Sequence, residues 1–358
     1  MTLHPQKCVV VPNHPPIDKL LAFKRVQLDL GGSYRLRLAF CTVNAPTAEM
    51  NERWNAMCDP DAGGPYHIDV AEKKYHNWAP SASQVEANAS AVTESRTFNM
   101  LVALINENNE TGKLKSYPFS IAKMIRDVYE IAASQEVVFE HGMDVVNAFF
   151  FRPNGRAWED LFQRDEYADL KKLWLGFGVS PREAMLPFTL PLYFRHLFLA
   201  GRSVAEIIAK VGWWLDKGKK VVALKDAAKK KVYKVTRFQI GSKQAGYVKV
   251  DGAFEFAAFS YAWVGSGQLA VAVIRNERGH VHIQSSVRHP GANFDELAKT
   301  LEAAEPGRWY YETRFPAPML MNGSRQFTGV TPTDFSDDAL IALVLNSVTF
   351  ANGQGFAR

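Results

Sequence analysis

A short run of β-branched residues near the N-terminus constrains the fold more than any other feature. Residues 7–11 (KCVVV) form this run, which ends at Pro12. Such a run is typical of a strand that is buried in a sheet. A helical pattern at 19–26 and a strand-like segment at 35–43 follow it. Strand and helix therefore alternate at the start of the chain, which predicts an α/β fold.

The pattern becomes helical in the middle of the chain and strand-like after it. Between 134 and 216 apolar residues recur at helical spacing, with Gly201 and Gly218 as expected helix ends. Past Lys231 short apolar runs separated by glycine predict strands. We expect helices at 90–106, 118–133, 137–151, 158–175, 181–199, 204–215, 293–303 and 334–348. We expect the later strands at 232–240, 254–261, 269–274 and 280–285.

These changes of pattern divide the chain into three parts. We expect an α/β domain with a helical half at 1–200 and a basic connector at 201–235. A smaller C-terminal α/β domain with a mixed sheet is expected at 236–358.

The composition indicates a packed globular protein. Of the 358 residues, 47% are hydrophobic and 22% are charged. No apolar run reaches the roughly 18 residues of a membrane span, and the N-terminus lacks the apolar core of a secretory signal, so we expect a cytoplasmic protein with no membrane partner. Cys8, Cys41 and Cys58 form no CxxC pair and are expected to be reduced thiols. The absence of GxSxG, P-loop, HExxH and dinucleotide-binding motifs excludes several enzyme classes.

Positive charge is concentrated in one segment. Residues 210–249 contain twelve Lys or Arg and only two acids, Asp216 and Asp226, which gives +10, whereas the whole chain carries +5. A segment of this density can attract the phosphates of a nucleic acid. The alternative is a solvated helix face with no ligand.

Imidazole and carboxylate side chains cluster at 66–78 (YHIDVAEKKYHNW), beside a predicted strand end. His67 and Asp69 are two residues apart and so share one face of a strand, while His76 and Asn77 follow a short charged turn. These groups are too poor in carboxylates to hold a pair of hard divalent ions. The alternative for the two histidines is ordinary hydrogen bonding at a strand end.

Four segments in order carry a resemblance to a known family. They are VPNHPPIDK at 11–19, IDVAEKKYHNW at 68–78, INENNETG at 105–112 and VHIQSSVRHPGANFDELAKTLE at 281–302. This layout resembles the DHH phosphoesterase superfamily of RecJ-like exonucleases, nano-RNases and exopolyphosphatase-like proteins. The resemblance implies an N-terminal parallel-sheet domain with two manganese ions, held by a His-x-x-x-Asp-x-Asp loop, a later Asp, the Asp-His-His motif and a further Asp. It also implies a smaller C-terminal domain that holds the substrate phosphate.

The family's metal ligands carry over only in part. Asp18 matches the second aspartate of the first loop, whereas Pro16 stands at the first aspartate and Pro12 at the histidine, unless His14 substitutes for it. The Asp-His-His triplet is Tyr75-His76-Asn77 here, and Asn109 replaces the later aspartate. The resemblance therefore implies weak or absent binding of Mn²⁺. The implied catalytic residues are Asp18, Asp69 and His76, and the implied metal ligands are these three with His14 and His67.

The C-terminal part contains a candidate anion site. Arginine offers a planar fork of donors to a phosphate, and serine hydroxyls add neutral donors. The expected ligand-binding residues are Ser285, Ser286, Arg288, His289 and Arg308. The alternative is an ordinary polar loop. His280 and His282 share a strand face, but no acid lies near them in the sequence, so a surface role is favoured over a metal site.

Three hypotheses follow for the function. In the first, a divergent DHH-like protein binds a phosphorylated small molecule, such as a nucleotide, or single-stranded nucleic acid between two domains, with hydrolysis reduced or lost. In the second, an active Mn-dependent phosphodiesterase uses a remodelled site. In the third, the fold is kept for a scaffold or assembly role. Whether or not the protein is active, we expect His67, Asp69, His76 and Asp18 to converge in one pocket at the carboxyl edge of a parallel sheet.

Overall fold

The computed structural model describes residues 4–42, 46–68, 96–111, 120–150, 168, 172, 188–313, 317–323 and 329–351. The chain divides into two compact units, Met1–Val221 and Val222–Arg358, with the boundary inside helix α10 (Val204–Lys230). The first unit contains a parallel sheet and the second a mixed one, so the predicted α/β fold class is confirmed. Among the helices of the described residues, none combines the length and apolar character needed to cross a bilayer.

The described residues of the first unit form a parallel sheet of three strands. Strand β1 (Gln6–Pro12) lies between β2 (Arg35–Cys41) and β3 (Tyr66–His67). Val9, one of the β-branched residues, is completely buried, as expected for a central strand covered on both faces.

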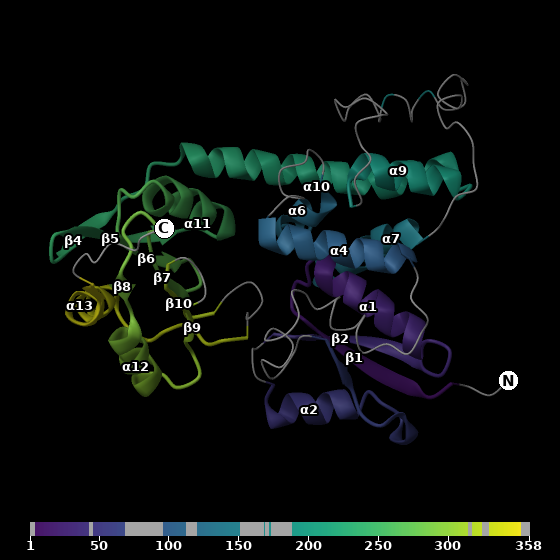
Figure 1. Ribbon diagram of the computed structural model, residues 1–358, viewed down its shortest axis with the longest axis horizontal. Helices are drawn as coiled ribbons and strands as arrows, with labels where there is room; N and C mark the ends of the chain where they lie inside the picture. The colour runs from purple at the N-terminus through teal and green to yellow at the C-terminus, as the bar shows by residue number, and fades with distance from the viewer. Residues whose placement is uncertain are drawn as a thin grey trace. The chain divides into compact units, whose positions relative to one another are not determined.

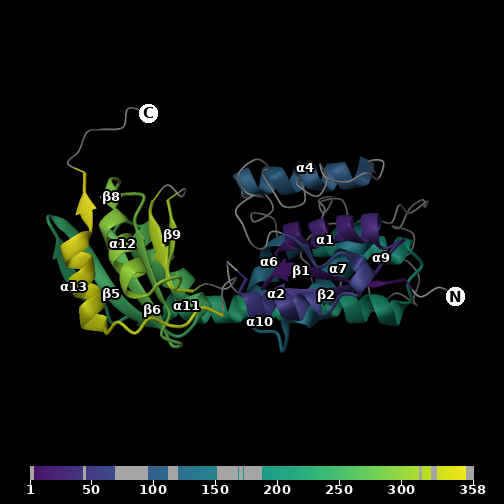
Figure 2. The ribbon, with the colours of Figure 1, turned by 90° about the horizontal axis from the view of Figure 1, so that it is seen from below.

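Helices cover both faces of this sheet. Helix α1 (Ile17–Leu30) lies on one face and α2 (Ala48–Asn55) on the other, which Figure 1 shows directly and Figure 2, seen from below, shows with α2 overlying the strands. In the described part of the unit, further helices are α4 (Arg96–Thr111), α6 (Ile121–Tyr129), α7 (Gln135–Phe150), α9 (Leu190–Leu199) and the first part of α10. Helix α7 can pack closely on α1 because Gly142 has no side chain. A Cβ at this position would lie only 2.4 Å from the Leu20 side chain.

Two glycines of the helical region behave differently. Gly201 adopts a positive φ of 69° directly after α9, so its predicted role as a helix end is confirmed. The predicted end at Gly218 is wrong, because α10 continues through this residue to Lys230. A Cβ at Gly218 would lie 2.8 Å from the sulfur of Met124 on α6, so the glycine provides room for a neighbouring helix. The expected helix at 158–175 lies outside the described residues, apart from 168 and 172.

The second unit is built on a six-stranded mixed sheet in the order β4-β5-β6-β7-β10-β9. Strands β5 and β6 are parallel, and the other neighbouring pairs are antiparallel. The strands are β4 (Thr236–Ile240), β5 (Lys243–Val250), β6 (Val271–Asn276), β7 (Val281–Ser285), β9 (Tyr310–Glu312) and β10 (Met319–Met321). A separate two-stranded sheet joins β8 (Ala292–Asn293) and β11 (Thr349–Phe350).

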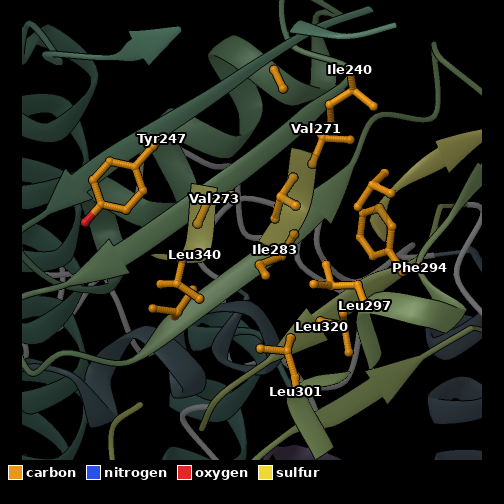
Figure 3. Packing of buried hydrophobic residues seen from close by; sticks show 14 residues of the cluster. Ile240, Tyr247, Val271, Val273, Ile283, Phe294, Leu297, Leu301, Leu320 and Leu340 are labelled. Carbon is orange, nitrogen blue, oxygen red and sulfur yellow. The ribbon is translucent and has the colours of Figure 1, made fainter. Parts of the chain in front are cut away.

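Each face of the larger sheet has its own apolar core. Helices α12 (Asp295–Ala304) and α13 (Asp337–Ser347) cover one face, where Leu297 and Leu340 pack against Val273 and Ile283 (Figure 3). Helix α11 (Ala253–Phe259) and the π-helical segment Ser260–Gly265 cover the other face. Ser336 caps α13 by accepting a hydrogen bond from the backbone N–H of Ala339.

The strand predicted at 254–261 is wrong, because these residues form α11 and the start of the π-helical segment. The carboxylate of Glu255 accepts the backbone N–H of Asp251 at 2.8 Å, which caps the helix start. The sequence does not predict strand β5, because Gly246 interrupts its apolar pattern. Glycine is needed at this position for close packing, since a Cβ would lie 2.8 Å from the Val235 side chain.

Candidate functional site

The carboxyl end of β1 is a topological switch point. From β1 the chain passes through α1 to β2 on one side, and it returns to β3 on the other side. In open α/β sheets, ligands bind outside the carboxyl ends of the strands at such a point. The loop from Asn13 to Pro16 and the first turn of α1 lie here, and the N–H of the buried Asn13 donates to the carbonyl of Cys41 at 2.8 Å.

Two opposite charges are buried at this edge. Lys19 is 4% exposed and Asp18 is 8% exposed, and the ammonium nitrogen lies 3.2 Å from a carboxylate oxygen. Burying either charge alone is costly, whereas the pair carries no net charge. The sequence interpretation includes Asp18 and misses Lys19. The burial of Lys19 depends on the packing around the start of α1, which the local sequence does not show.

His14 lies in the loop with a positive φ of 51°, a backbone conformation that is uncommon outside glycine. Its ring stacks on Tyr129 of α6, with centroids 5.0 Å apart. The Tyr129 hydroxyl donates to the carbonyl of Pro15 at 3.2 Å, and the N–H of His14 donates to the side chain of Gln135 at 3.4 Å. Burial, with a smaller effect of the nearby Glu136 carboxylate, raises the pKa of Tyr129, so the hydroxyl keeps its proton.

His67 lies on β3 beside Val10, and its ring meets Trp54 of α2 edge to face at 5.5 Å. Burial lowers the pKa of His67, and its Nε2 atom is buried without a hydrogen-bond partner in the described part of the chain. His67 thus contacts the helix on one face of the sheet, whereas His14 contacts helices packed on the other face (Figure 1). The structure does not bring these two imidazoles together. Asp69 and His76 lie outside the described residues, so convergence of the four predicted residues stays a prediction.

The described donors do not fit a pair of manganese ions. No group of three His, Cys, Asp or Glu side chains within the described ranges is placed to hold a metal ion. Asp18 offers a single carboxylate that already faces an ammonium group. Manganese prefers several oxygen ligands, and a two-metal centre needs anionic oxygens around both ions.

Four of the residues predicted to bind an anion form hydrogen bonds with backbone carbonyls of the second unit. The Ser286 hydroxyl donates to the carbonyl of Val264 at 2.6 Å, and the Nε of Arg288 donates to Gly265 at 3.0 Å. The Nε2 of His289 lies 2.8 Å from the carbonyl of Gly267. These three side chains hold the turn at 264–267. The Ser285 hydroxyl donates to the carbonyl of Pro318 at 3.3 Å.

Arg308 lies at the other end of β7. Its backbone carbonyl accepts from Asn322, whose own N–H binds Val281 at the first residue of this strand. Its guanidinium pairs with Asp334 at 2.7 Å and lies 3.7 Å from Glu305. The structure therefore does not bring Arg308 together with Ser285, Ser286, Arg288 and His289.

His280 and His282, at the start of β7, pack against other groups of the second unit. The ring of His282 packs on Phe256 with centroids 4.7 Å apart, and the Nδ1 of His280 lies 3.1 Å from the carbonyl of Asn322. Burial, with a smaller effect of His280, lowers the pKa of His282 to about 4. His282 is therefore neutral at physiological pH.

Several lysines of the basic segment are ion-paired. Lys220 lies 3.0 Å from Asp216, and Lys229 lies 3.3 Å from Asp226. Lys231 binds the carboxylates of Asp251 and Glu255, each at 2.7 Å, and these hydrogen bonds raise its pKa. Lys219 and Lys230 are exposed and have no ion-pair partner among the described residues.

No protein-family model matches the chain, and no curated protein matches it. Among solved structures, the chain is similar to exonuclease RecJ bound to manganese, at 11% identity over 91% of this chain and 88% of that chain, with a TM-score of 0.37. It is similar to RecJ in complex with Mn²⁺ from Thermus thermophilus, at 11% identity, 91% and 51% coverage and a TM-score of 0.35. It thus spans about half of that RecJ chain. An uncharacterized protein from Helicobacter pylori G27 is similar at 9% identity, 96% and 98% coverage and a TM-score of 0.24. At these values the likeness assigns neither a family nor a function.

Proposed function

We propose that the protein binds a phosphorylated ligand, a nucleotide or single-stranded nucleic acid, at the carboxyl end of β1, and that its hydrolysis of such a ligand is reduced or lost. The switch point at β1 carries this proposal. It places the loop from Asn13 to Pro16, the first turn of α1 and the buried Lys19 at one edge of a parallel sheet.

The start of α1 favours an anionic group. The helix spans Ile17–Leu30, and its N-cap residue, Pro16, makes no side-chain capping bond. The N–H groups of a first helical turn and the positive end of the helix dipole attract phosphate. Lys19 adds a fixed positive charge in the same turn, although Asp18 offsets it.

Reduced hydrolysis follows from the ligand set. Two-metal phosphoester hydrolysis uses anionic oxygens to hold two cations and activate a water molecule. Asp18 is the predicted metal-ligating carboxylate that the structure describes at this edge, and it is paired with Lys19. In this proposal the chain is a distant, divergent relative of the DHH phosphoesterases that has lost most of their metal ligands. An active Mn-dependent enzyme would need Asp69 and His76 to complete its centre.

Fluorescence anisotropy with a short labelled single-stranded oligonucleotide tests the proposal, together with thermal unfolding in the presence of a nucleotide. A ligand at about 100 times its Kd stabilises the folded state by about 2.7 kcal/mol. We expect binding that weakens in Lys19→Gln, which removes the positive charge in the first turn of α1. Arg278→Gln, on an exposed turn of the second unit, is the matched control. Absence of binding, with formation of a defined assembly, would support the scaffold hypothesis instead. Rapid manganese-dependent cleavage would support the active enzyme.

A further inference from the structure

Lys19 has a position that is unusual for a lysine. Its side chain is 6% exposed, and that of Asp18 is 11% exposed. Adjacent residues of a helix point in different directions and do not normally face each other. Here both side chains nevertheless reach one point, where nitrogen and oxygen lie 3.2 Å apart. The two charges therefore form a buried ion pair at the switch point and not a surface ion pair.

We infer that Lys19 is a built-in counter-ion for Asp18, which supplies the positive charge that a divalent cation would otherwise supply, so that the site binds its phosphorylated ligand without a divalent metal. This inference rests on the proposed function of the same site. It identifies the ligand class as phosphate groups that are bound free of Mn²⁺ or Mg²⁺.

Electrostatics supports this role. A divalent cation on either oxygen of Asp18 would lie within a few ångströms of the ammonium, and like charges repel strongly at that distance in a buried environment. The ammonium already neutralises the carboxylate, so a metal ion would gain little at this position. The surrounding loop is fixed by the hydrogen bonds from Asn13 to Cys41 and from Tyr129 to Pro15.

Thermal unfolding of the unaltered protein with MnCl₂ alone is the first test. We expect no shift of the midpoint temperature between metal-free buffer with EDTA and buffer with manganese. Oligonucleotide affinity, measured by anisotropy, should likewise be equal in EDTA and in manganese. A manganese-dependent rise of the midpoint by several degrees that is lost in Asp18→Asn would overturn the inference.

A double-mutant cycle tests the ion pair itself. Lys19→Met and Asp18→Asn should each lower the midpoint temperature, and the double variant should lose less than the sum of the two single losses. Manganese should raise the midpoint of Lys19→Met, in which the Lys19 ammonium no longer faces Asp18, and should leave the control Lys123→Met on α6 unchanged. The counter-ion role would be contradicted if the two losses were additive and manganese did not change the midpoint temperature of Lys19→Met. If these variants do not fold, the measurements on the unaltered protein still decide.

The two proposals fail in different ways. Oligonucleotide binding that EDTA abolishes and manganese restores would remove the counter-ion role and leave the proposed function standing. Absence of oligonucleotide and nucleotide binding would remove the proposed function. The manganese titration of the unaltered protein would then judge the role of Lys19 alone.

Discussion

Two regions of the molecule contain residues that the sequence groups as candidate sites, and they use them differently: Asp18 lies at the edge of the first sheet, whereas Ser286, Arg288 and His289 follow β7 in the second unit. At the carboxyl end of β1, two opposite charges face each other in a buried position. At the turn 264–267, hydroxyl, guanidinium and imidazole groups bind backbone carbonyls. A segment rich in hydrogen-bond donors therefore does not by itself form an anion-binding site. The partners of each donor decide whether it supports structure or remains available for a ligand.

Breaking the buried pair should give the largest effect. Lys19→Met leaves the carboxylate of Asp18 buried beside a methionine, and loss of one partner of a buried pair costs about 3–5 kcal/mol. Urea unfolding of the variant measures this loss. The exposed Lys123→Met should change stability by no more than about 0.5 kcal/mol. A loss below about 1 kcal/mol for Lys19→Met would show that the pair behaves like a surface ion pair.

Acid should weaken the second unit through His282. The pKa of this histidine is lowered to about 4 in the folded protein, whereas an unperturbed histidine has a pKa of about 6.5. The unfolded chain therefore takes up a proton first, so the contribution is present above about pH 6.5 and is lost as the pH falls towards about 4. The loss is at most about 3 kcal/mol. His282→Asn should flatten the dependence of the free energy of unfolding on pH in this window, and equal slopes for both proteins would contradict the assignment.

Removing a hydroxyl from the turn should have a smaller effect. The Ser286 hydroxyl is buried and donates to Val264, so Ser286→Ala leaves that carbonyl without this donor and should cost about 1–2 kcal/mol. Affinity for the labelled oligonucleotide should stay unchanged, because the turn uses this group for structure. Ser266→Ala, at an exposed position of the same turn, is the comparison variant. Lost affinity without lost stability would return Ser286 to the ligand-binding set.

The exposed lysines should give the smallest effect. Lys219 and Lys230 are solvated, and neighbouring lysines are neutralised by Asp216 and Asp226. We therefore expect Lys219→Gln/Lys230→Gln to leave the salt dependence of oligonucleotide binding unchanged. If each lysine contacted a phosphate, the slope of log affinity against log salt would fall by about 0.7 per lysine. A salt series of anisotropy measurements on both proteins distinguishes the two outcomes.

The predictable parts of the fold are those where local pattern and burial agree. The run at 7–11 forms the central strand because β-branched side chains suit a strand covered on both faces. The error at Gly218 has a tertiary cause, because Met124 of α6 needs space beside α10. The error at 254–261 has a local cause, because the carboxylate of Glu255 caps a helix where a short apolar run fits either a strand or a helix.

The candidate site is predictable only to the level of its sheet edge. Asp18 is identifiable from its place after the first strand, whereas Lys19 is not, because helical lysines are normally exposed. Its burial depends on the packing around the helix start, which no local pattern encodes. For the same reason the sequence does not separate Arg308 from the serines, since that separation reflects the register of β7 and β10.

The contacts that hold His14 and Pro15 have a consequence for the order of folding. The hydrogen bond from Tyr129 to Pro15 spans 114 residues, and that from His14 to Gln135 spans 121 residues. Contacts of such separation form only after a long loop has been closed, which slows their formation. During synthesis the loop after β1 leaves the ribosome well before α6 and α7 exist to anchor it. The loop at the carboxyl end of β1 therefore reaches its final conformation late, when these two helices dock.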